Sequence, residues 1–415
     1  MQPETGQGRD LHQPSKQRYA LPCSGPLSGQ PRQVELGAGT AVLCHEEGDP
    51  EGVNRIRVRC GRIDAEVLPS KGFSVGQVVC RGSPVFWKPP LKNLPEPAEV
   101  DPEAPLLVNG SSLDGFGWIR GFTGGVEMLG PLNWGMPLQT PDGRLLGLHG
   151  AAANIPVREA TVRMLNNELW LTASFEVRIR KGRTVEEARP WYEAGDPIYR
   201  VTKHLIFNPE VPGFRLQDEL TNLSSTVRTP DWGYHVQLHP QPEARYLVPS
   251  RRRRLRGGEA VNRDHEVWRP VAPGSPRMER GVVHRQAMQK PGIPDGSPGV
   301  PTLLRYPDGS GIEVILPPVP YLMSWFSAGG AGSDEFMIPP PPDSGEGSRR
   351  ILERDWNGVG PEIGVSDLDH AGDVDPAIVR QPLEPGKSVT IKLQFRCLAD
   401  EEAAEREREI RDYGN

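Results

Sequence analysis

The sequence lacks the features that define secreted, zinc-binding and membrane-spanning proteins. It has only five cysteines among 415 residues, an odd number without any Cys-x-x-Cys spacing. This pattern disfavours a disulfide framework or a zinc knuckle and favours free thiols in a reducing compartment. No stretch approaches the ~18 apolar residues of a membrane helix, and the first residues, Met1–Thr5, lack the apolar run of a secretory signal. We therefore expect a cytoplasmic protein that does not contact a membrane.

A surplus of positive charge is also missing. Lysine and arginine number 48 against 54 aspartates and glutamates, which gives a net charge of −6. Such a balance offers no electrostatic basis for binding nucleic acid or an acidic membrane surface. The run Arg251–Arg254 is the one local exception, and its position beside Pro249 predicts a solvated loop.

Glycine and proline, by contrast, are abundant. The chain has 47 glycines and 45 prolines, an excess that predicts many turns and argues against a helical protein. Between the turns, apolar and polar residues alternate with the period of two that is typical of strands. The predicted strands include 34–36, 41–44, 55–60, 65–68, 74–80, 84–87, 157–164, 168–179, 199–207, 213–220, 312–316 and 388–395.

The same patterns predict how the chain is divided. Residues 1–30 are polar and read as a disordered or loosely attached arm. Residues 31–398 form one β domain, in which 251–300 and 326–360 are weakly periodic and read as insertions. Residues 399–415 form a charged C-terminal tail with a short helix. Strands do not alternate with long helices, so a doubly wound α/β fold is disfavoured.

Three polar residues stand in unusual surroundings and suggest a site assembled by the fold. His149 lies in the turn Gly147-Leu-His-Gly150, where glycine allows backbone and ligand to approach closely. His235 lies between aromatic residues in Asp231-Trp-Gly-Tyr-His-Val-Gln237. Glu362 lies between glycine and proline in Gly360-Pro-Glu-Ile-Gly364.

The order of these motifs resembles the aldose 1-epimerase, or galactose mutarotase-like, superfamily, and a largely uncharacterised bacterial branch of it in particular. The resemblance runs from about residue 33 to 397 and rests on order and spacing, because each motif alone is weak. The matching segments are Val67–Gly76, Arg120–Gly125, Leu148–Pro156, Glu219–Ser224, Gly233–His235, Pro320–Trp325 and Leu383–Phe395.

The resemblance implies a fold and a reaction. The fold is an all-β supersandwich of two large antiparallel sheets with loop insertions and a short C-terminal helix. The reaction interconverts the anomers of a free sugar and needs one base and one acid on opposite sides of the ring. His235 matches the acid and His149 the second histidine, which binds a hydroxyl or shares the proton. Glu362 is the candidate base, and the competing carboxylates are Glu335, Asp355 and Asp367.

This chain departs from the family pattern at several positions. Lys71-Gly-Phe-Ser74 stands where relatives carry Arg-Gly-Met-Asp, and Pro361-Glu362 reverses the usual Glu-Pro order. Ala151 follows His149-Gly150 where relatives carry arginine. The missing arginine suggests a ligand that differs from those of the relatives, with an anionic ligand disfavoured.

Further polar residues are candidates for binding sugar hydroxyls, because planar groups that both donate and accept suit carbohydrate. These candidates are Arg120, Glu127, Asn154, Asn222 and Gln237, with Trp325 as a stacking surface. A metal held by His235, His239 and Glu362 is disfavoured, because Pro240 and Pro242 suggest that the strand ends before His239.

We therefore expect a carbohydrate ligand, no cofactor and no metal, in a monomer or homodimer. The leading function is an aldose 1-epimerase-like isomerase acting on a monosaccharide or a modified sugar. Two alternatives remain open, since fold does not fix function. One is a non-catalytic carbohydrate-binding or sensing protein, and the other is a carbohydrate lyase or hydrolase.

Overall fold

A computed structural model describes most of the chain. The described residues are 18–23, 32–37, 39–44, 54–89, 95, 97–108, 111–180, 190–329, 335–338, 349–352 and 356–414. Most of the expected arm 1–30 lies outside them, but residues 18–22 form the first strand. The expected insertion 326–360 is also described only in part. No helix among the described residues has the length and apolar character to cross a membrane.

The first of two large sheets has ten strands, all antiparallel to their neighbours. Its longest strands, β14 and β15, have 12 residues each. Across the sheet the strands run β1 (Arg18–Pro22), β13 (Glu159–Leu165), β14 (Glu168–Ile179), β15 (Asp196–Phe207), β16 (Gly213–Asn222), β28 (Ser388–Leu398), β23 (Gly311–Leu316), β22 (Pro298–Arg305) and β18 (Arg245–Leu247), with β21 (Lys290–Pro291) beside β22.

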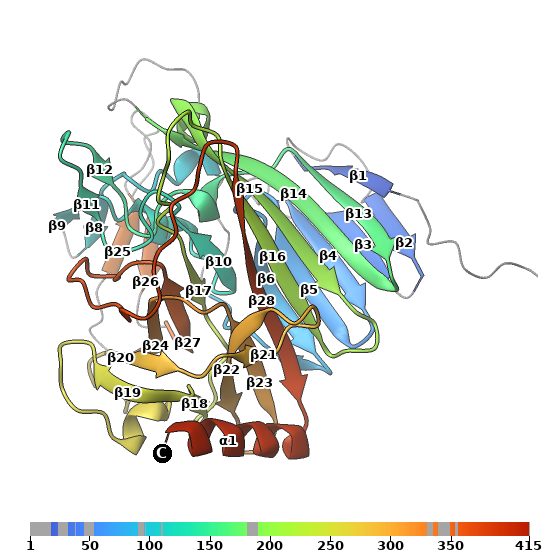
Figure 1. The fold of residues 1–415 in the computed structure, drawn as a ribbon, viewed down its shortest axis with the longest axis vertical. Coiled ribbons are helices and arrows are strands. Elements are labelled where there is room, and N and C mark those ends of the chain that lie inside the picture. Colours follow the sequence, from blue (N-terminus) through green and yellow to red (C-terminus); the bar gives the residue numbers. More distant parts are fainter. Residues whose placement is uncertain are drawn as a thin grey trace, which may run out of the picture.

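The second sheet has twelve strands, which come from between Arg32 and Gly364. Figure 1 shows the two sheets face to face, with the short outer strands gathered on one side. Across the sheet the strands run β19 (Ser250–Leu255), β20 (Met278–Ala287), β24 (Tyr321–Ala328), β27 (Gly358–Gly364), β17 (Gly233–Val236), β10 (Val126–Leu129), β6 (Ser74–Cys80), β5 (Ile63–Leu68), β4 (Arg55–Cys60), β3 (Gly39–Cys44) and β2 (Arg32–Leu36), with β7 (Ser83–Pro84) beside β6.

Smaller elements cover the outside of these sheets. Two short sheets are β26 (Arg349–Leu352), β25 (Glu335–Ile338), β8 (Leu106–Val108) and β9 (Ser111–Leu113), and β11 (Leu138–Gln139) with β12 (Leu145–Leu146). The 3₁₀ turns are η1 (Pro97–Glu99), η2 (Gly117–Gly121), η3 (Ala152–Asn154), η4 (Trp191–Glu193) and η5 (Arg263–Glu266). One α-helix, α1 (Asp400–Gly414), lies along the edge of the molecule (Figure 1). The predicted all-β supersandwich with a short C-terminal helix is therefore confirmed.

The space between the two large sheets is filled by apolar side chains. On β14 every second residue is buried, because one face packs inward and the other faces solvent. At the centre the rings of Phe214 and Phe395 stack with centroids 4.6 Å apart, and Phe86 from the opposite sheet packs edge-on against both. Burial of these aromatic faces holds the two sheets together.

The central strands of the 12-stranded sheet are buried on both faces. Every residue of β10, β17, β24 and β27 is buried. One face belongs to the inter-sheet core, and the other is covered by a separate cluster that includes Trp87, Trp118, Phe122, Trp134 and Trp325. The long segment between β7 and β13 supplies most of this cover. We call this covered side the outer face of the sheet.

The arginine run belongs to a strand, and the loop prediction for it is wrong. Arg251–Arg254 lie in β19, which pairs with β20. Acidic partners explain why four cations can stand together: Arg253 pairs with Glu266 and Arg254 with Asp373. Of the strands in the expected insertion 251–300, β19 and β20 belong to the 12-stranded sheet. β21 and the start of β22 belong to the ten-stranded sheet.

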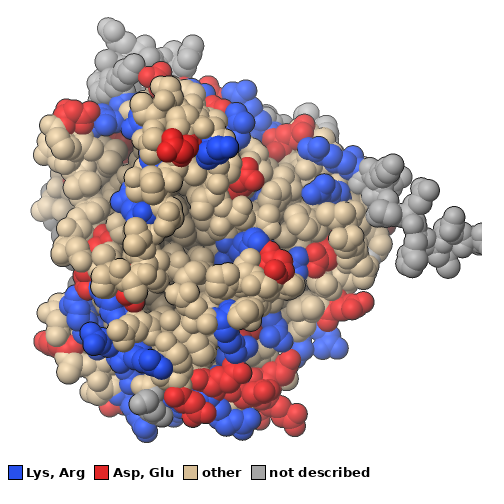
Figure 2. All heavy atoms as spheres, in the orientation of Figure 1, with Lys and Arg blue, Asp and Glu red and all other residues tan. Residues whose placement is uncertain are grey.

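The charged C-terminal segment packs as a helix. Ala403 and Ile410 of α1 are buried against Leu247, Leu303 and Leu398. Its other residues are mostly charged, and the space-filling view shows acidic side chains gathered over this edge of the molecule (Figure 2). The helix is therefore amphipathic, with its apolar stripe closing one end of the sandwich.

Candidate functional site

Three neighbouring strands place a row of ionisable side chains on the outer face of the 12-stranded sheet. Glu127 on β10 lies directly opposite His235 on β17. His235 in turn lies directly opposite Glu362 on β27. Residues opposite one another in antiparallel strands point to the same side of the sheet. The row therefore carries two carboxyl groups with a histidine between them.

His149 reaches this row from a turn. Its Nε2 lies 3.6 Å from Oε1 of Glu362, and its ring centroid lies 5.9 Å from that of His235. The backbone of His149 is left-handed, with φ of 56°, which is uncommon for a residue other than glycine. Backbone bonds hold it there, because the His149 N–H donates to the Gly135 carbonyl and the His149 carbonyl accepts from Gly130.

The protonation pattern of His149 is set by Trp134. Nδ1 of His149 lies 2.7 Å from the Trp134 carbonyl oxygen, which can only accept. Nδ1 therefore carries the proton, and Nε2 of the neutral ring offers a lone pair toward Glu362. The Trp134 indole is fixed in turn, since its Nε1 donates to the backbone and side-chain oxygens of Ser366.

Two glycines make room for that indole. A Cβ at Gly364 would lie 2.1 Å from the Trp134 ring, and one at Gly233 would lie 2.5 Å from it. Both glycines lie on the strands that carry Glu362 and His235. Gly364 and Gly233 therefore serve the site, because they let a tryptophan lie flat on the sheet.

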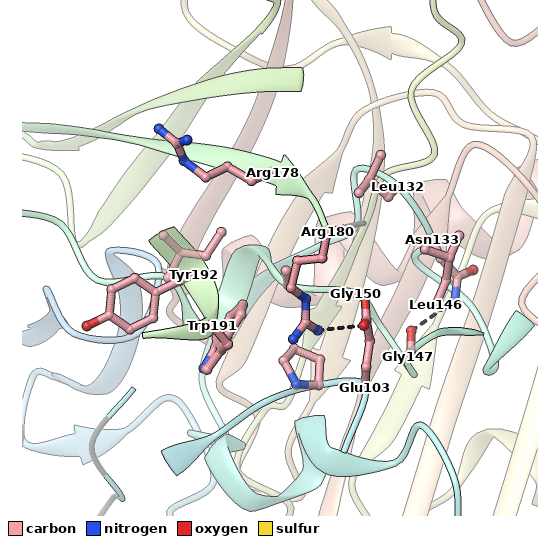
Figure 3. A pocket seen from close by; sticks show the side chains of 13 residues that line it. Glu103, Leu132, Asn133, Leu146, Gly147, Gly150, Arg178, Arg180, Trp191 and Tyr192 are labelled. Carbon is pink, nitrogen blue, oxygen red and sulfur yellow. Dashed lines mark hydrogen bonds and ion pairs between the residues drawn. The ribbon is translucent and has the colours of Figure 1, made fainter. Parts of the chain in front are cut away.

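A small cavity beside the His149 turn is lined in part by side chains that already form ion pairs or hydrogen bonds with other groups of the protein (Figure 3). It measures about 30 Å³, which is room for about one water molecule. Arg180 forms an ion pair with Glu103 at 2.7 Å and is also held by Asp101. Asn133 donates to the Gly147 carbonyl at 2.9 Å. These contacts brace the His149 turn.

Aromatic rings enclose the histidines and Glu362. The Trp118 ring lies 4.5 Å from that of His149, and Phe122 and Trp325 lie 5.0 Å and 5.4 Å from that of His235. His149 and His235 are each 6% exposed and Glu362 is 3% exposed. Such a surrounding excludes water and strengthens electrostatic effects.

Burial shifts the titration of the whole row. Desolvation raises the pKa of Glu362 to about 8, against the lowering effect of Arg256, and that of Glu127 to about 7. Desolvation also lowers the pKa of His149 to about 4 and that of His235 to about 3. At neutral pH both histidines are therefore neutral and Glu362 holds a proton. Strongly shifted groups that share an enclosed space are typical of functional sites.

Polar atoms at the site have been left without partners. Among the residues that the structure describes, no hydrogen bond reaches Nδ1 of His235, Oε2 of Glu127 or Nε1 of Trp118. Buried polar atoms are nearly always paired, so such atoms call for a ligand or water. Glu127 is held at its other oxygen, which accepts from the Thr123 backbone N–H and hydroxyl.

The other predicted binding residues divide into two groups. Gln237 and Trp325 lie near His235 on the outer face, with the Trp325 Nε1 donating to Glu279. Arg120, Asn154 and Asn222 instead make structural contacts. Arg120 donates to the Pro105 carbonyl, and Asn154 accepts from Lys71 at 3.5 Å.

Asn222 is not brought to the site. It lies on β16 in the other sheet, where its amide donates to the carbonyls of Thr226 and Leu383 and accepts from Ser224. Among the competing carboxylates, Asp367 accepts from the backbone of Asp369, Ala371 and Asp373. Asp355 and the side chain of Glu335 lie outside the described residues.

Arg256 and Trp118 were missed by the sequence analysis. Arg256 pairs with Asp369 and lowers the pKa values of both Glu362 and His149. A cation is thus present near the acid–base groups although Ala151 replaces the expected arginine. The only sequence signal was the neighbouring arginine run, which by itself predicts a solvated surface. In the part of the chain that the structure describes, no group of three His, Cys, Asp or Glu side chains could hold a metal ion.

The fold and the site define an enclosed acid–base centre on a galactose mutarotase-like supersandwich. Comparison of the sequence with family models places the chain in one family. The domain of unknown function DUF4432 matches residues 50–294, and the chain belongs to this family. No curated protein matches the sequence.

The chain is similar to several solved structures. A candidate aldose 1-epimerase from Klebsiella pneumoniae is 17% identical, with 96% of each chain covered and a TM-score of 0.60. A TPR-domain containing protein from Parabacteroides distasonis is 12% identical, with 93% of this chain and 56% of that chain covered and a TM-score of 0.50. A galactose mutarotase-like protein from Clostridium acetobutylicum is 13% identical, with 83% and 95% covered and a TM-score of 0.49. At these identities the likeness extends to the fold alone.

Proposed function

We propose that this protein is an aldose 1-epimerase-like isomerase that interconverts the anomers of a monosaccharide or a modified sugar. The observation that carries the proposal is that Glu362, His235 and His149 lie together in one buried cluster. These residues come from three distant parts of the chain. The distance from Nε2 of His149 to Oε1 of Glu362 is 3.6 Å, and β17 and β27 hold His235 directly opposite Glu362.

Mutarotation requires two proton transfers. A base takes the proton of the anomeric hydroxyl while an acid gives a proton to the ring oxygen, and the ring opens. Rotation about the C1–C2 bond and closure on the other face then return both protons. Glu362 is assigned as the base and His235 as the acid, and His149 binds a hydroxyl or shares the proton.

The number of protons in the site supports this chemistry. Near neutral pH, Glu362 and His235 together hold one proton, which is what a pair of one acid and one base needs. In the ligand-free site the proton rests on Glu362, because the pKa of Glu362 is raised to about 8 and that of His235 is lowered to about 3. The assigned roles require this proton to move to His235, against the order of the two pKa values in the ligand-free site. The assignment predicts a rate that is steady in the neutral range and falls above about pH 8, as Glu362 loses the proton.

Anomer exchange measured by saturation-transfer NMR on several aldoses tests the proposal. Wild-type protein is expected to accelerate the exchange of at least one sugar. Glu362→Gln and His235→Ala are expected to lose activity by about 10²-fold or more. A wild-type protein no faster than His235→Ala on every sugar would overturn the proposal, and sugar binding without exchange would favour a binding or sensing protein.

A further inference from the structure

Gln237 is a buried amide on the outer face that the acid–base chemistry does not use. It lies two residues beyond His235, so its side chain is on the same side of the sheet. Gln237 is fully buried, at 0% exposure. Among the described residues neither Nε2 nor Oε1 has a hydrogen-bond partner. A buried amide with both ends unpaired is costly, since each unmade hydrogen bond keeps its full desolvation penalty.

The position of this side chain is fixed by its surroundings. A Cβ at Gly358 would lie 2.2 Å from Nε2 of Gln237 and 2.6 Å from Cδ. Gly358 precedes Glu362 by four residues on β27, which is two full strand periods, so both face the same way. Backbone bonds secure Gln237 as well, because its N–H donates to Gly125 and its carbonyl accepts from Trp87, each at 3.0 Å.

Buried aromatic rings lie nearby. The ring of Phe122 lies 5.0 Å from that of His235 and 5.2 Å from that of Trp356, and Trp356 lies 5.9 Å from Trp87. An uncharged amide near such rings both donates and accepts hydrogen bonds in one plane. This combination matches two neighbouring hydroxyls on a sugar ring, whose apolar face packs on the aromatic rings.

We infer that Gln237 determines specificity at this site by binding a pair of adjacent hydroxyls on the sugar. The inference rests on the proposed function, since it assumes that the ligand has its anomeric centre at Glu362 and His235. Two residues along a strand span about 7 Å, comparable with the length of one pyranose ring. Gln237 therefore binds hydroxyls on the far side of the ring from the anomeric carbon.

Stability of the ligand-free protein separates this role from a structural one. If the amide serves the ligand, replacing it with an apolar side chain of similar size removes a cost. Gln237→Met and Gln237→Leu are then expected to unfold at the same or a higher temperature than wild type. The matched control is Gln77→Met, because the Gln77 amide already donates to the Trp87 carbonyl at 3.1 Å. That variant is expected to lose stability and to keep its affinity for sugar.

Binding and exchange are then measured with D-glucose, D-galactose and their monodeoxy analogues. For the sugar that wild type prefers, Gln237→Met is expected to raise KM roughly 10- to 100-fold and to change kcat much less. One or two deoxy analogues should bind wild type about as weakly as the intact sugar binds the variant. For those analogues the substitution should make little further difference.

The possible failures are distinguishable. Active wild-type protein combined with an unchanged KM in Gln237→Met would overturn the inference and leave the proposed function standing. A clear loss of stability in both Gln237 variants without sugar would also overturn it, because the amide would then be structural. Absence of any binding or exchange by wild type would overturn the proposed function together with this inference.

Discussion

The polar groups on the two faces of strand β17 differ in their hydrogen bonding. On the inter-sheet face, the Tyr234 hydroxyl donates to Oδ2 of Asp218 at 2.6 Å, and Nζ of Lys203 meets the same oxygen at 2.6 Å. On the outer face, the next residue, His235, keeps an unpartnered Nδ1 among the described residues. Both faces are buried. Oδ2 of Asp218 on the inner face therefore has two donors, while its Oδ1 has none among the described residues, and Nδ1 of His235 on the outer face has no partner there.

Breaking the inner pair should have the largest effect. Lys203 and Asp218 are both 0% exposed. Lys203→Met would leave an unpaired carboxylate between the sheets, and we expect a loss of about 3–5 kcal/mol in the free energy of unfolding. The triple variant Lys203→Met, Asp218→Leu, Tyr234→Phe should recover most of that loss, because it removes the whole polar group. Urea unfolding measures both; an equally unstable triple variant would mean that packing matters more than charge.

The difference between the faces also explains which parts of the fold were predictable. Strands β14, β15, β16 and β28 have one face on the core and one toward solvent, and their alternating residues predicted them. Strands β10, β24 and β27 are covered on both sides by distant segments, so no alternation exists to be read. β27 even contains Pro361 and three glycines, which sequence rules assign to turns.

The site shows the same limit. The resemblance in motif order suggested His149, His235 and Glu362, and the fold brings them together. Their pKa shifts depend on Trp118 and Phe122 closing the space and on Arg256 standing nearby. These neighbours come from other segments of the chain, and only the fold shows that they lie beside the histidines and Glu362.

The second prediction concerns the outer face, where a substitution is expected to stabilise the protein and not to destabilise it. The pKa of the Glu362 carboxyl is raised from 4.5 to about 8. Between these values the folded protein keeps a proton that the unfolded chain releases, so this group makes stability fall as pH rises from about 4.5 to 8. Glu362→Gln should therefore be more stable than wild type at pH 9, by a few kcal/mol, and about equal near pH 4.

Thermal or urea unfolding across this pH range measures that difference directly. Comparison with the variant is needed because the lowered pKa values of His149 and His235 act in the other direction between about pH 4 and 6.5. A stability difference that does not change with pH would show that the Glu362 pKa is close to its ordinary value.

A smaller effect is expected where structure supports the site. Gly364→Ala would bring a Cβ within 2.1 Å of the Trp134 ring, and we expect a loss of about 1–3 kcal/mol from overpacking. Displacement of Trp134 should also weaken the hydrogen bond that Nδ1 of His149 donates to the Trp134 carbonyl, which ¹⁵N NMR of the imidazole would detect as a changed tautomer. The control is Gly82→Ala, where a Cβ meets nothing within 4 Å and only the φ of 85° is strained. An unchanged His149 signal in Gly364→Ala would refute the role of Trp134.

The smallest expected effect concerns the positive charge of Arg256. Arg256 lowers the pKa of Glu362, while Glu279 and Asp369 raise it. Arg256→Gln should therefore move the Glu362 pKa further upward, by roughly half a unit to one unit at a partly screened site. Arg254→Gln is the matched control, because Arg254 lies two residues away and pairs with Asp373 instead. Carboxyl ¹³C NMR of Glu362 follows the titration without any need for activity. If both substitutions shifted the pKa equally, the charge of the whole arginine run would act on Glu362. A shift confined to Arg256→Gln would mean that this one cation keeps the pKa of the buried carboxyl close enough to neutral pH for the group to exchange its proton.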